Sequence, residues 1–188
     1  MSTDTLPAPL ALTPGRWPVD RNHSAITFSI RHLGLSKVRG RFSVFDVTLE
    51  VGPSALDLQV TATIDLASID TNNPDRDTHL RSTDFFHVDQ HPTMTFQSSS
   101  IVPAKDGYAL NGALTLNGVT RPVTLHVESN GLAVFQGDGT THAGLSATGE
   151  LRRSEFGIEF GIMPIGIDRL ALADKVEFEL EMQFVQPS

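Results

Sequence analysis

The residues best suited to chemistry lie in one stretch, DRDTHLRSTDFFHVDQHPTMTF at positions 75–96, which holds three histidines and four aspartates. Imidazole and carboxylate groups at this density can bind a metal ion or act as an acid–base pair. The spacing of His79, His87 and His91 matches no zinc motif, and the chain has no cysteine to complete one. Pro92 disfavours the helix that would bring the last two histidines onto one face. We therefore interpret the stretch as scaffold, and we expect no metal and no cofactor.

Other catalytic arrangements are equally weak. Ser82 and Ser154 have acids nearby, but neither lies in a Gly-x-Ser-x-Gly turn. The acids Asp84, Asp89 and Glu155 form no recognisable acid–base pair. The chain also lacks a phosphate-binding glycine loop and a dinucleotide fingerprint. We expect that the protein is not an enzyme.

Composition narrows the class of protein further. The chain has 188 residues, a net charge of −8 and no cysteine. The net negative charge argues against nucleic-acid binding, which normally uses a basic face. The N-terminus lacks the basic region and apolar core of a signal peptide, and no run approaches the ~18 apolar residues of a membrane span. We expect a cytoplasmic protein with no stable membrane insertion, in which a flexible tail at residues 1–16 precedes a single domain at residues 17–186.

Alternation of apolar and polar residues with a period of two dominates that domain. It is clearest in SAITFSIRH at 24–32, LDLQVTATID at 56–65 and KVEFELEMQF at 175–184. Such alternation indicates strands with one buried face and one solvated face, which is typical of antiparallel sheets. The pattern predicts an all-β meander of eight to ten strands.

Glycine-containing dipeptides separate several of these runs: Asp106-Gly107, Asn117-Gly118 and Asn130-Gly131. They predict tight hairpin turns because they tolerate positive φ. Closing the meander into a barrel would remove its two exposed edges. Gly112 and Gly149 interrupt otherwise apolar inner faces, which indicates either a partly open lumen or a bend in the strand. We favour a lumen that holds a small ligand.

One segment breaks the alternation. Asn73 is a suitable N-cap and Pro74 fits the first helical position, and acids and bases follow at the ends that the helix dipole favours. These signals predict a short helix at residues 74–81. Because a helix this short does not persist alone in water, we expect Leu80, Phe85 and Phe86 to pin it by packing.

From Trp17 onward the chain resembles the YceI-like family of lipid-binding, lipocalin-like barrels. The matching segments, in the family's order, are Trp17–Phe42, Ile69–Phe86, His91–Phe96, Leu114–Leu125, Gly149–Ile158 and the closing run KVEFELEMQF. The resemblance implies an extended antiparallel β-barrel whose apolar lumen binds a polyisoprenoid, an isoprenoid quinone or a similar long-chain lipid for storage or transport. It also implies that the stretch NxxRDxHLRSxDFF is a structural connection at one end of the barrel.

We expect the ligand to contact an apolar set of side chains that ends in one histidine. The expected lumen residues are Ile26, Phe28, Ile30, His32, Phe42, Phe45, Met94, Phe96, Leu114, Leu116, Phe178 and Leu180. The histidine, His32, either meets a polar head group or hydrogen-bonds to backbone at a strand end. We interpret Lys37 and Arg39 as solvated loop residues.

We therefore expect an isoprenoid or fatty-acid-like lipid as the partner, and we leave a homodimer open. Two alternatives remain open. One is an enzyme that acts on an isoprenoid-type lipid, with the barrel as substrate tunnel. The other is a filled barrel that serves as an interaction module.

Overall fold

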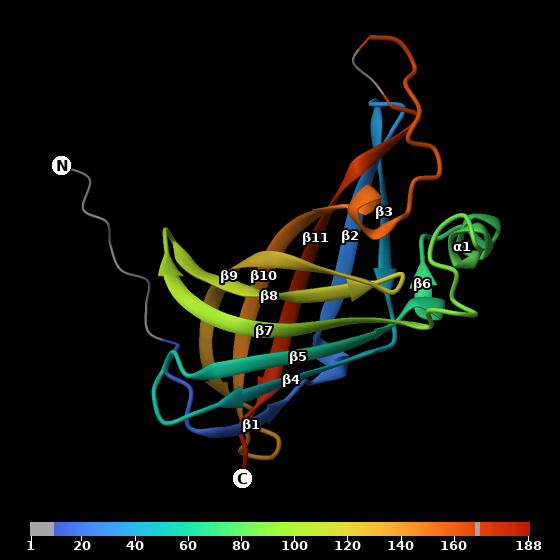
Figure 1. The fold of residues 1–188 in the computed structure, drawn as a ribbon. Coiled ribbons are helices and arrows are strands. Elements are labelled where there is room, and N and C mark those ends of the chain that lie inside the picture. Colours follow the sequence, from blue (N-terminus) through green and yellow to red (C-terminus); the bar gives the residue numbers. More distant parts are fainter. Residues whose placement is uncertain (1–9, 168–169) are drawn as a thin grey trace.

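The computed structural model of the protein describes residues 10–167 and 170–188, which form one strongly curled antiparallel sheet with a short helix beside it (Figure 1). The strands are β1 (Gly15–Pro18), β2 (Ala25–His32), β3 (Ser36–Phe42), β4 (Phe45–Val51), β5 (Leu58–Asp65), β6 (Ile69–Asp70), β7 (Thr93–Ala104), β8 (Gly107–Leu116), β9 (Val119–Val134), β10 (Thr141–Arg152) and β11 (Leu172–Val185). Across the sheet they follow the order β1-β4-β5-β7-β8-β9-β10-β11-β2-β3-β6.

The predicted all-β class is confirmed, but the described residues form an 11-stranded sheet rather than one of eight to ten strands. The extra strands include β1 and β6, which have 4 and 2 residues. A segment this short cannot display a period-two pattern, so alternation alone does not reveal it.

Two of the three predicted hairpin turns are present. Asp106 has φ of 60° between β7 and β8, and Asn117-Gly118 has φ of 53° and 72° between β8 and β9. The turn predicted at Asn130-Gly131 is wrong, because β9 runs through it. Here Gly131 pairs with Gly144 and Ser129 with Leu145, which leaves the intervening asparagine unpaired in a bulge. A bulge and a tight turn both favour glycine at positive φ, so the dipeptide does not distinguish them.

The one α-helix among the described residues, α1 (Pro74–Arg81), has the predicted bounds. The Asn73 side chain accepts a hydrogen bond from the backbone N–H of Arg76 at 3.0 Å, and Pro74 occupies the first turn. Three 3₁₀ turns complete the described elements: η1 (Arg21–His23), η2 (Leu66–Ser68) and η3 (Arg153–Phe156).

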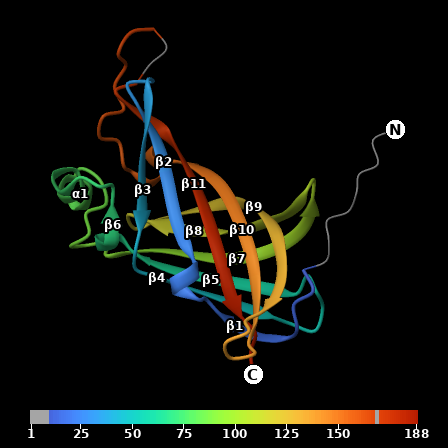
Figure 2. The same cartoon turned by 180° about the vertical axis from the view of Figure 1, so that it is seen from behind.

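The sheet curls until its first strand approaches β11, which is also visible from behind in Figure 2. An isolated bridge joins Val19 to Phe184, and the backbone N–H of Asp20 donates to the carbonyl of Gln183 at 2.7 Å. At the other end of the sheet, the Arg41 guanidinium of β3 donates to the Asp70 carboxylate of β6 at 2.9 Å. The curled sheet is thus fastened at both of its edges.

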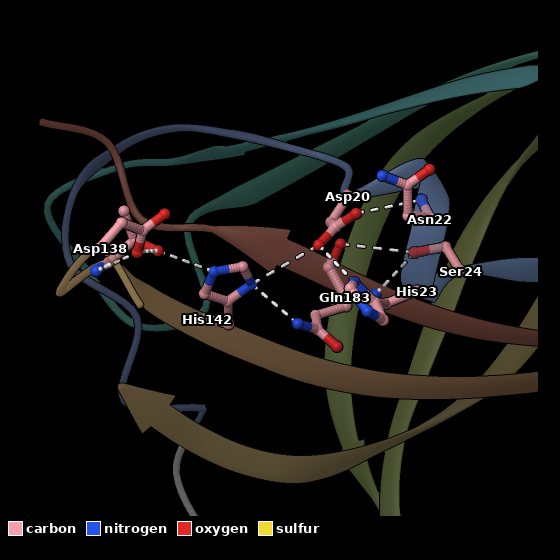
Figure 3. A network of polar contacts seen from close by, with 8 residues as sticks. Asp20, Asn22, His23, Ser24, Asp138, His142 and Gln183 are labelled. Carbon is pink, nitrogen blue, oxygen red and sulfur yellow. Dashed lines mark hydrogen bonds and ion pairs between the residues drawn. The ribbon is translucent and has the colours of Figure 1, made fainter. Parts of the chain in front are cut away.

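A polar network reinforces the seam between β1 and β11 (Figure 3). The Asp20 carboxylate contacts Nδ1 of His23 at 2.8 Å, and the Gln183 side-chain amide donates to Nδ1 of His142 at 2.8 Å. The hydroxyl of Ser24 accepts from the backbone N–H of Gln183 at 2.9 Å. The hydrogen bond with His23, followed by that from the backbone N–H of Asn22, lowers the pKa of Asp20.

The predicted flexible tail at residues 1–16 needs a correction. Residues 1–9 lie outside the described residues, but Leu10 and Leu12 are buried in the core and β1 already begins at Gly15. The Trp17 indole donates to the carbonyl of Thr13 at 2.9 Å, which fastens this segment to the strand that follows. Alternating small, proline and apolar residues resemble a loose tail in sequence, whereas their burial depends on the sheet that they cover.

Candidate ligand cavity

The inside of the curled sheet is filled at one end. Among the residues that occupy it, Trp17 and Leu49 are at most 1% exposed, and Tyr108, Val127 and Phe184 are also buried. None of these residues lines the cavity at the opposite end. They come from β1, β4, β8, β9 and β11, so the packing at this end draws on strands from all around the sheet.

The other end of the same strands encloses a cavity of about 490 Å³. Along β8 the lining starts at Leu114 and Leu116, whereas Leu110 on the same face lies in the filled core. Along β11 it includes Phe178 and Leu180 but not the buried Met182. The cavity is therefore limited to one half of the barrel. Its volume lies within the range of ~300–1,000 Å³ that is usual for small-molecule sites.

The structure brings the predicted lumen residues together, with one exception. Lining this cavity are Ile26, Phe28, Ile30, His32, Phe42, Met94, Phe96, Leu114, Leu116, Phe178 and Leu180. Phe45 was also expected there, but it is buried in the core at the start of β4 and does not line the cavity. Alternation places a residue on the inner face of a strand, but it does not say how far along the barrel the cavity extends.

Sequence reasoning missed the part of the lining that does not come from strands. Arg76, His79 and Leu80 of α1 contribute, together with Phe85 and Phe86 of the following turn. The segment after η3 contributes Ile158, Phe160 and Gly161. These residues form no periodic pattern. The signal that could have found them was the cluster of phenylalanines beside a helix too short to persist alone.

The polar residues of α1 fasten the helix to the segment before it. The buried Asp77 carboxylate accepts from the backbone N–H of Thr71 at 2.9 Å and from its hydroxyl at 2.5 Å. Arg76 donates to the same threonine, and the Arg81 guanidinium donates to the carbonyl of Ala67 at 2.9 Å. The helix is thereby held against the segment that precedes it.

The histidines of the opening stretch also have local contacts. His79 Nε2 lies 2.8 Å from the Asp84 carboxylate, and its ring packs edge-on against Phe85 and Phe160. The rings of His87 and His91 are 6.0 Å apart. Within residues 10–167 and 170–188, no group of three or more histidine, cysteine, aspartate or glutamate side chains is arranged to hold a metal ion.

A buried arginine holds the segment that follows β10. Arg153, only 4% exposed, donates to the carbonyls of Ile158, Phe160, Leu172 and Ala173 at 2.6–3.1 Å. Burial lowers the pKa of its guanidinium. Four backbone acceptors compensate for removing this charge from water. The arginine therefore fixes the position of the Phe160 segment over the cavity.

The glycines of the inner face make room for phenylalanine rings. A Cβ atom added at Gly149 would lie 2.5 Å from Cζ of Phe178, its partner on β11, and one added at Gly112 would lie 2.4 Å from Cζ of Phe96. Gly40 lies equally close to the ring of Phe28. The sequence indicated either a partly open lumen or a bend in the strand at Gly112 and Gly149, and the structure shows neither. They are positions that a neighbouring ring covers.

The cavity reaches the surface near the turn between β2 and β3. His32 and Phe160 both line it and both are exposed. Among the described residues, no side-chain hydrogen bond links His32 to a backbone group. Of the residues that the structure describes, no aspartate or glutamate lines the cavity, and the arginines that line it, Arg76 and Arg153, have donors engaged within the protein. His32 thus offers a free imidazole at the mouth of a mainly apolar site.

The fold and this cavity together define a class of protein, a lipocalin-like antiparallel barrel with an apolar internal site. The model of the YceI-like domain matches residues 17–184. The chain belongs to the YceI-like family.

Curated relatives and solved structures agree with this assignment. The chain is 37% identical to a UPF0312 protein of Staphylococcus aureus over 166 residues, which cover 88% of this chain and 94% of the relative. It is 42% identical to a UPF0312 protein of Pseudomonas aeruginosa over 148 residues, which cover 76% of this chain and 74% of the relative.

Among solved structures, the YCEI protein of Campylobacter jejuni superposes with a TM-score of 0.71 at 28% identity, covering 85% of this chain and 91% of that one. BcnA of Burkholderia cenocepacia superposes with a TM-score of 0.73 at 24% identity, covering 88% and 98%. A polyisoprenoid binding domain from Saccharophagus degradans gives a TM-score of 0.67 at 14% identity, covering 91% and 98%. The last two similarities concern the fold alone. No helix in the described part of this chain is long and apolar enough to cross a bilayer.

Proposed function

We propose that the protein binds a long-chain apolar molecule in this cavity, for storage or transport, without reacting with it. The ligand class is a polyisoprenoid, an isoprenoid quinone or a similar lipid. The observation that carries the proposal is the cavity of about 490 Å³ at one end of the barrel, lined mainly by apolar side chains and open at His32. The Saccharophagus degradans domain of similar fold, which is named for polyisoprenoid binding, supports the ligand class.

The cavity volume sets the length of chain that it accommodates. At roughly 30 Å³ for each water-sized group, 490 Å³ holds about sixteen such groups. Burying about fifteen methylene groups at ~0.8 kcal/mol each gives an upper bound near 12 kcal/mol, before the entropy of ordering the ligand is subtracted. We infer that a chain of about fifteen carbons fills the site and that a longer one extends past His32.

The open end of the lumen favours a binding protein over a filled interaction module. The arginines and acids beside the cavity are engaged in holding α1 and the Phe160 segment, which favours binding over catalysis. In the proposed complex the apolar chain lies against Phe96, Leu114 and Phe178, and a polar head group lies beside His32.

Mass spectrometry of an organic extract of the protein, purified from its native host, tests the proposal. We expect one class of isoprenoid or fatty-acid-like lipid at close to one molecule per barrel. A Leu114→Trp variant purified in parallel serves as the matched control and should carry less. An extract without lipid, combined with no uptake of a fluorescent fatty acid or retinoid by the purified protein, would contradict the proposal.

A further inference from the structure

Exposed apolar side chains surround the mouth of the cavity. They come from the turn between β2 and β3 and from the segment between η3 and β11, and we call them the mouth rim: Leu35, Phe160, Met163, Ile165 and Ile167. Leu35 is 66% exposed, Met163 57% and Ile167 100%. Single exposed apolar residues are ordinary, but a group of them at the opening of an apolar cavity marks an interaction surface.

Backbone hydrogen bonds hold the two parts of the mouth rim together. The N–H of Leu33 donates to the carbonyl of Ala171 at 3.0 Å, and the N–H of Ala171 donates to the carbonyl of Met163 at 3.0 Å. Figures 1 and 2 both show the β2–β3 turn beside the orange segment, at the end of the molecule far from the C-terminus. The rim is therefore one surface.

Positive charge lies along the two strands that lead to the mouth rim. Residues 25–44, which include β2 and β3, contain Arg31, Lys37, Arg39 and Arg41 and no acid, in a chain with a net charge of −8. Lys37 pairs with Glu177 and Arg41 pairs with Asp70. In the described part of the chain, no ion pair engages Arg31 or Arg39, and both are exposed. The segment between η3 and β11 has one acid among its described residues, Glu159.

We propose that the mouth rim docks on the surface of an anionic lipid bilayer, so that an apolar ligand passes between bilayer and cavity without crossing water. This rests on the proposed function. Apolar side chains that enter the head-group region beside exposed basic residues are the usual elements of peripheral membrane contact. The contact is reversible and superficial.

Charge argues for a bilayer over a second copy of the chain. A twofold dimer whose axis passes near the β2–β3 turn would set each copy's unpaired Arg31 close to that of its partner. Like charges brought together in this way oppose association. An anionic lipid surface instead attracts Arg31, and the interior of a bilayer dissolves a long apolar ligand.

Transfer kinetics test the proposal with the full-length protein and a fluorescent fatty acid as the probe. The acceptors are vesicles of phosphatidylcholine, alone or mixed with phosphatidylglycerol. If the rim docks, the transfer rate rises in proportion to vesicle concentration, is higher with the anionic vesicles, and falls with added salt. Release through water would give a rate that does not depend on vesicle concentration.

A Leu35→Glu/Ile167→Glu variant removes the apolar contact at exposed positions that packing does not require. We expect it to bind the fatty acid within about twofold of wild type and to transfer it about tenfold more slowly to anionic vesicles. The matched control is Val134→Glu/Phe135→Glu at the β9–β10 hairpin, where both residues are 58% exposed, and it should transfer like wild type.

Three results would overturn the docking proposal. One is a wild-type rate independent of vesicle concentration, and another is a mouth-rim variant that transfers like wild type. The third is loss of a dimer in that variant, seen by sedimentation, with transfer unchanged, since the rim would then contact a second copy. If the proposed function itself is wrong, neither the wild type nor any variant takes up the fluorescent fatty acid, and this outcome differs from the three above. In that event, co-sedimentation of the unloaded protein with anionic vesicles still decides whether the rim docks.

Discussion

Leu110 and Leu114 point to the same face of β8, one in the filled end of the barrel and one in the cavity, so the same substitution at both separates packing from ligand binding. Both side chains are buried, at 4% and 7% exposure. At Leu110 a tryptophan has no free space, and overpacking should lower the free energy of unfolding by ~1–3 kcal/mol. At Leu114 the larger ring can extend into the cavity, so the loss of stability should stay below ~1 kcal/mol.

The effect on ligand binding should be reversed. Leu114→Trp adds about six non-hydrogen atoms, and if half of that space is lost to the ligand, about three methylene groups are displaced. At ~0.8 kcal/mol each, the binding free energy weakens by ~2.4 kcal/mol, which is about fiftyfold in Kd. Leu110→Trp should leave Kd within about threefold of wild type, because it lies outside the cavity.

Urea unfolding measures the stability of each variant, and titration with a fluorescent fatty acid or retinoid measures uptake. The reasoning fails if Leu114→Trp binds the probe as tightly as wild type, because the ligand would then lie elsewhere. It also fails if Leu114→Trp is destabilised as much as Leu110→Trp, because the space around Leu114 would then be filled.

Three further predictions concern the scaffold. Phe85→Ala should lower the free energy of unfolding by ~3–5 kcal/mol, because the ring is buried beneath α1. The control Thr83→Ala, at an exposed position in the same turn, should change that free energy by no more than ~0.5 kcal/mol. Equal urea midpoints for the two variants would contradict the packing role of Phe85. Asp77→Ala should lower the free energy of unfolding by ~1–3 kcal/mol, because it leaves the buried backbone N–H of Thr71 without an acceptor. The control Asp89→Ala, at an exposed position, should leave the urea midpoint close to that of wild type. In the folded protein the pKa of Asp20 lies below its ordinary value of 3.8. The ionised carboxylate therefore stabilises the fold above pH 3.8, and this contribution is lost as the pH falls through the lower pKa of the folded state. The urea midpoint of Asp20→Asn should therefore lie below that of wild type at about pH 7, and the two should converge in acid; a gap that widens in acid would refute this sign.

The sequence by itself determined the class of fold and the local structure of its connections. Period-two alternation identifies which face of a strand is apolar, whatever the strand later packs against, and it correctly grouped Ile26, Phe28 and Ile30 on one face. The bounds of α1 followed from Asn73 and Pro74, because capping is decided within a few residues of chain.

Only the tertiary structure decided where the barrel is filled and where it is open. Trp17 packs in the filled end, and α1 lines part of the cavity at the other end. Both arrangements depend on contacts between segments far apart in the chain. For the same reason, Phe45 and Phe42 look equivalent in sequence, but only Phe42 lines the cavity. The Asn130-Gly131 pair shows the same limit at a smaller scale. Its positive φ is a local property, but whether that φ makes a turn or a bulge depends on the strand that pairs with it.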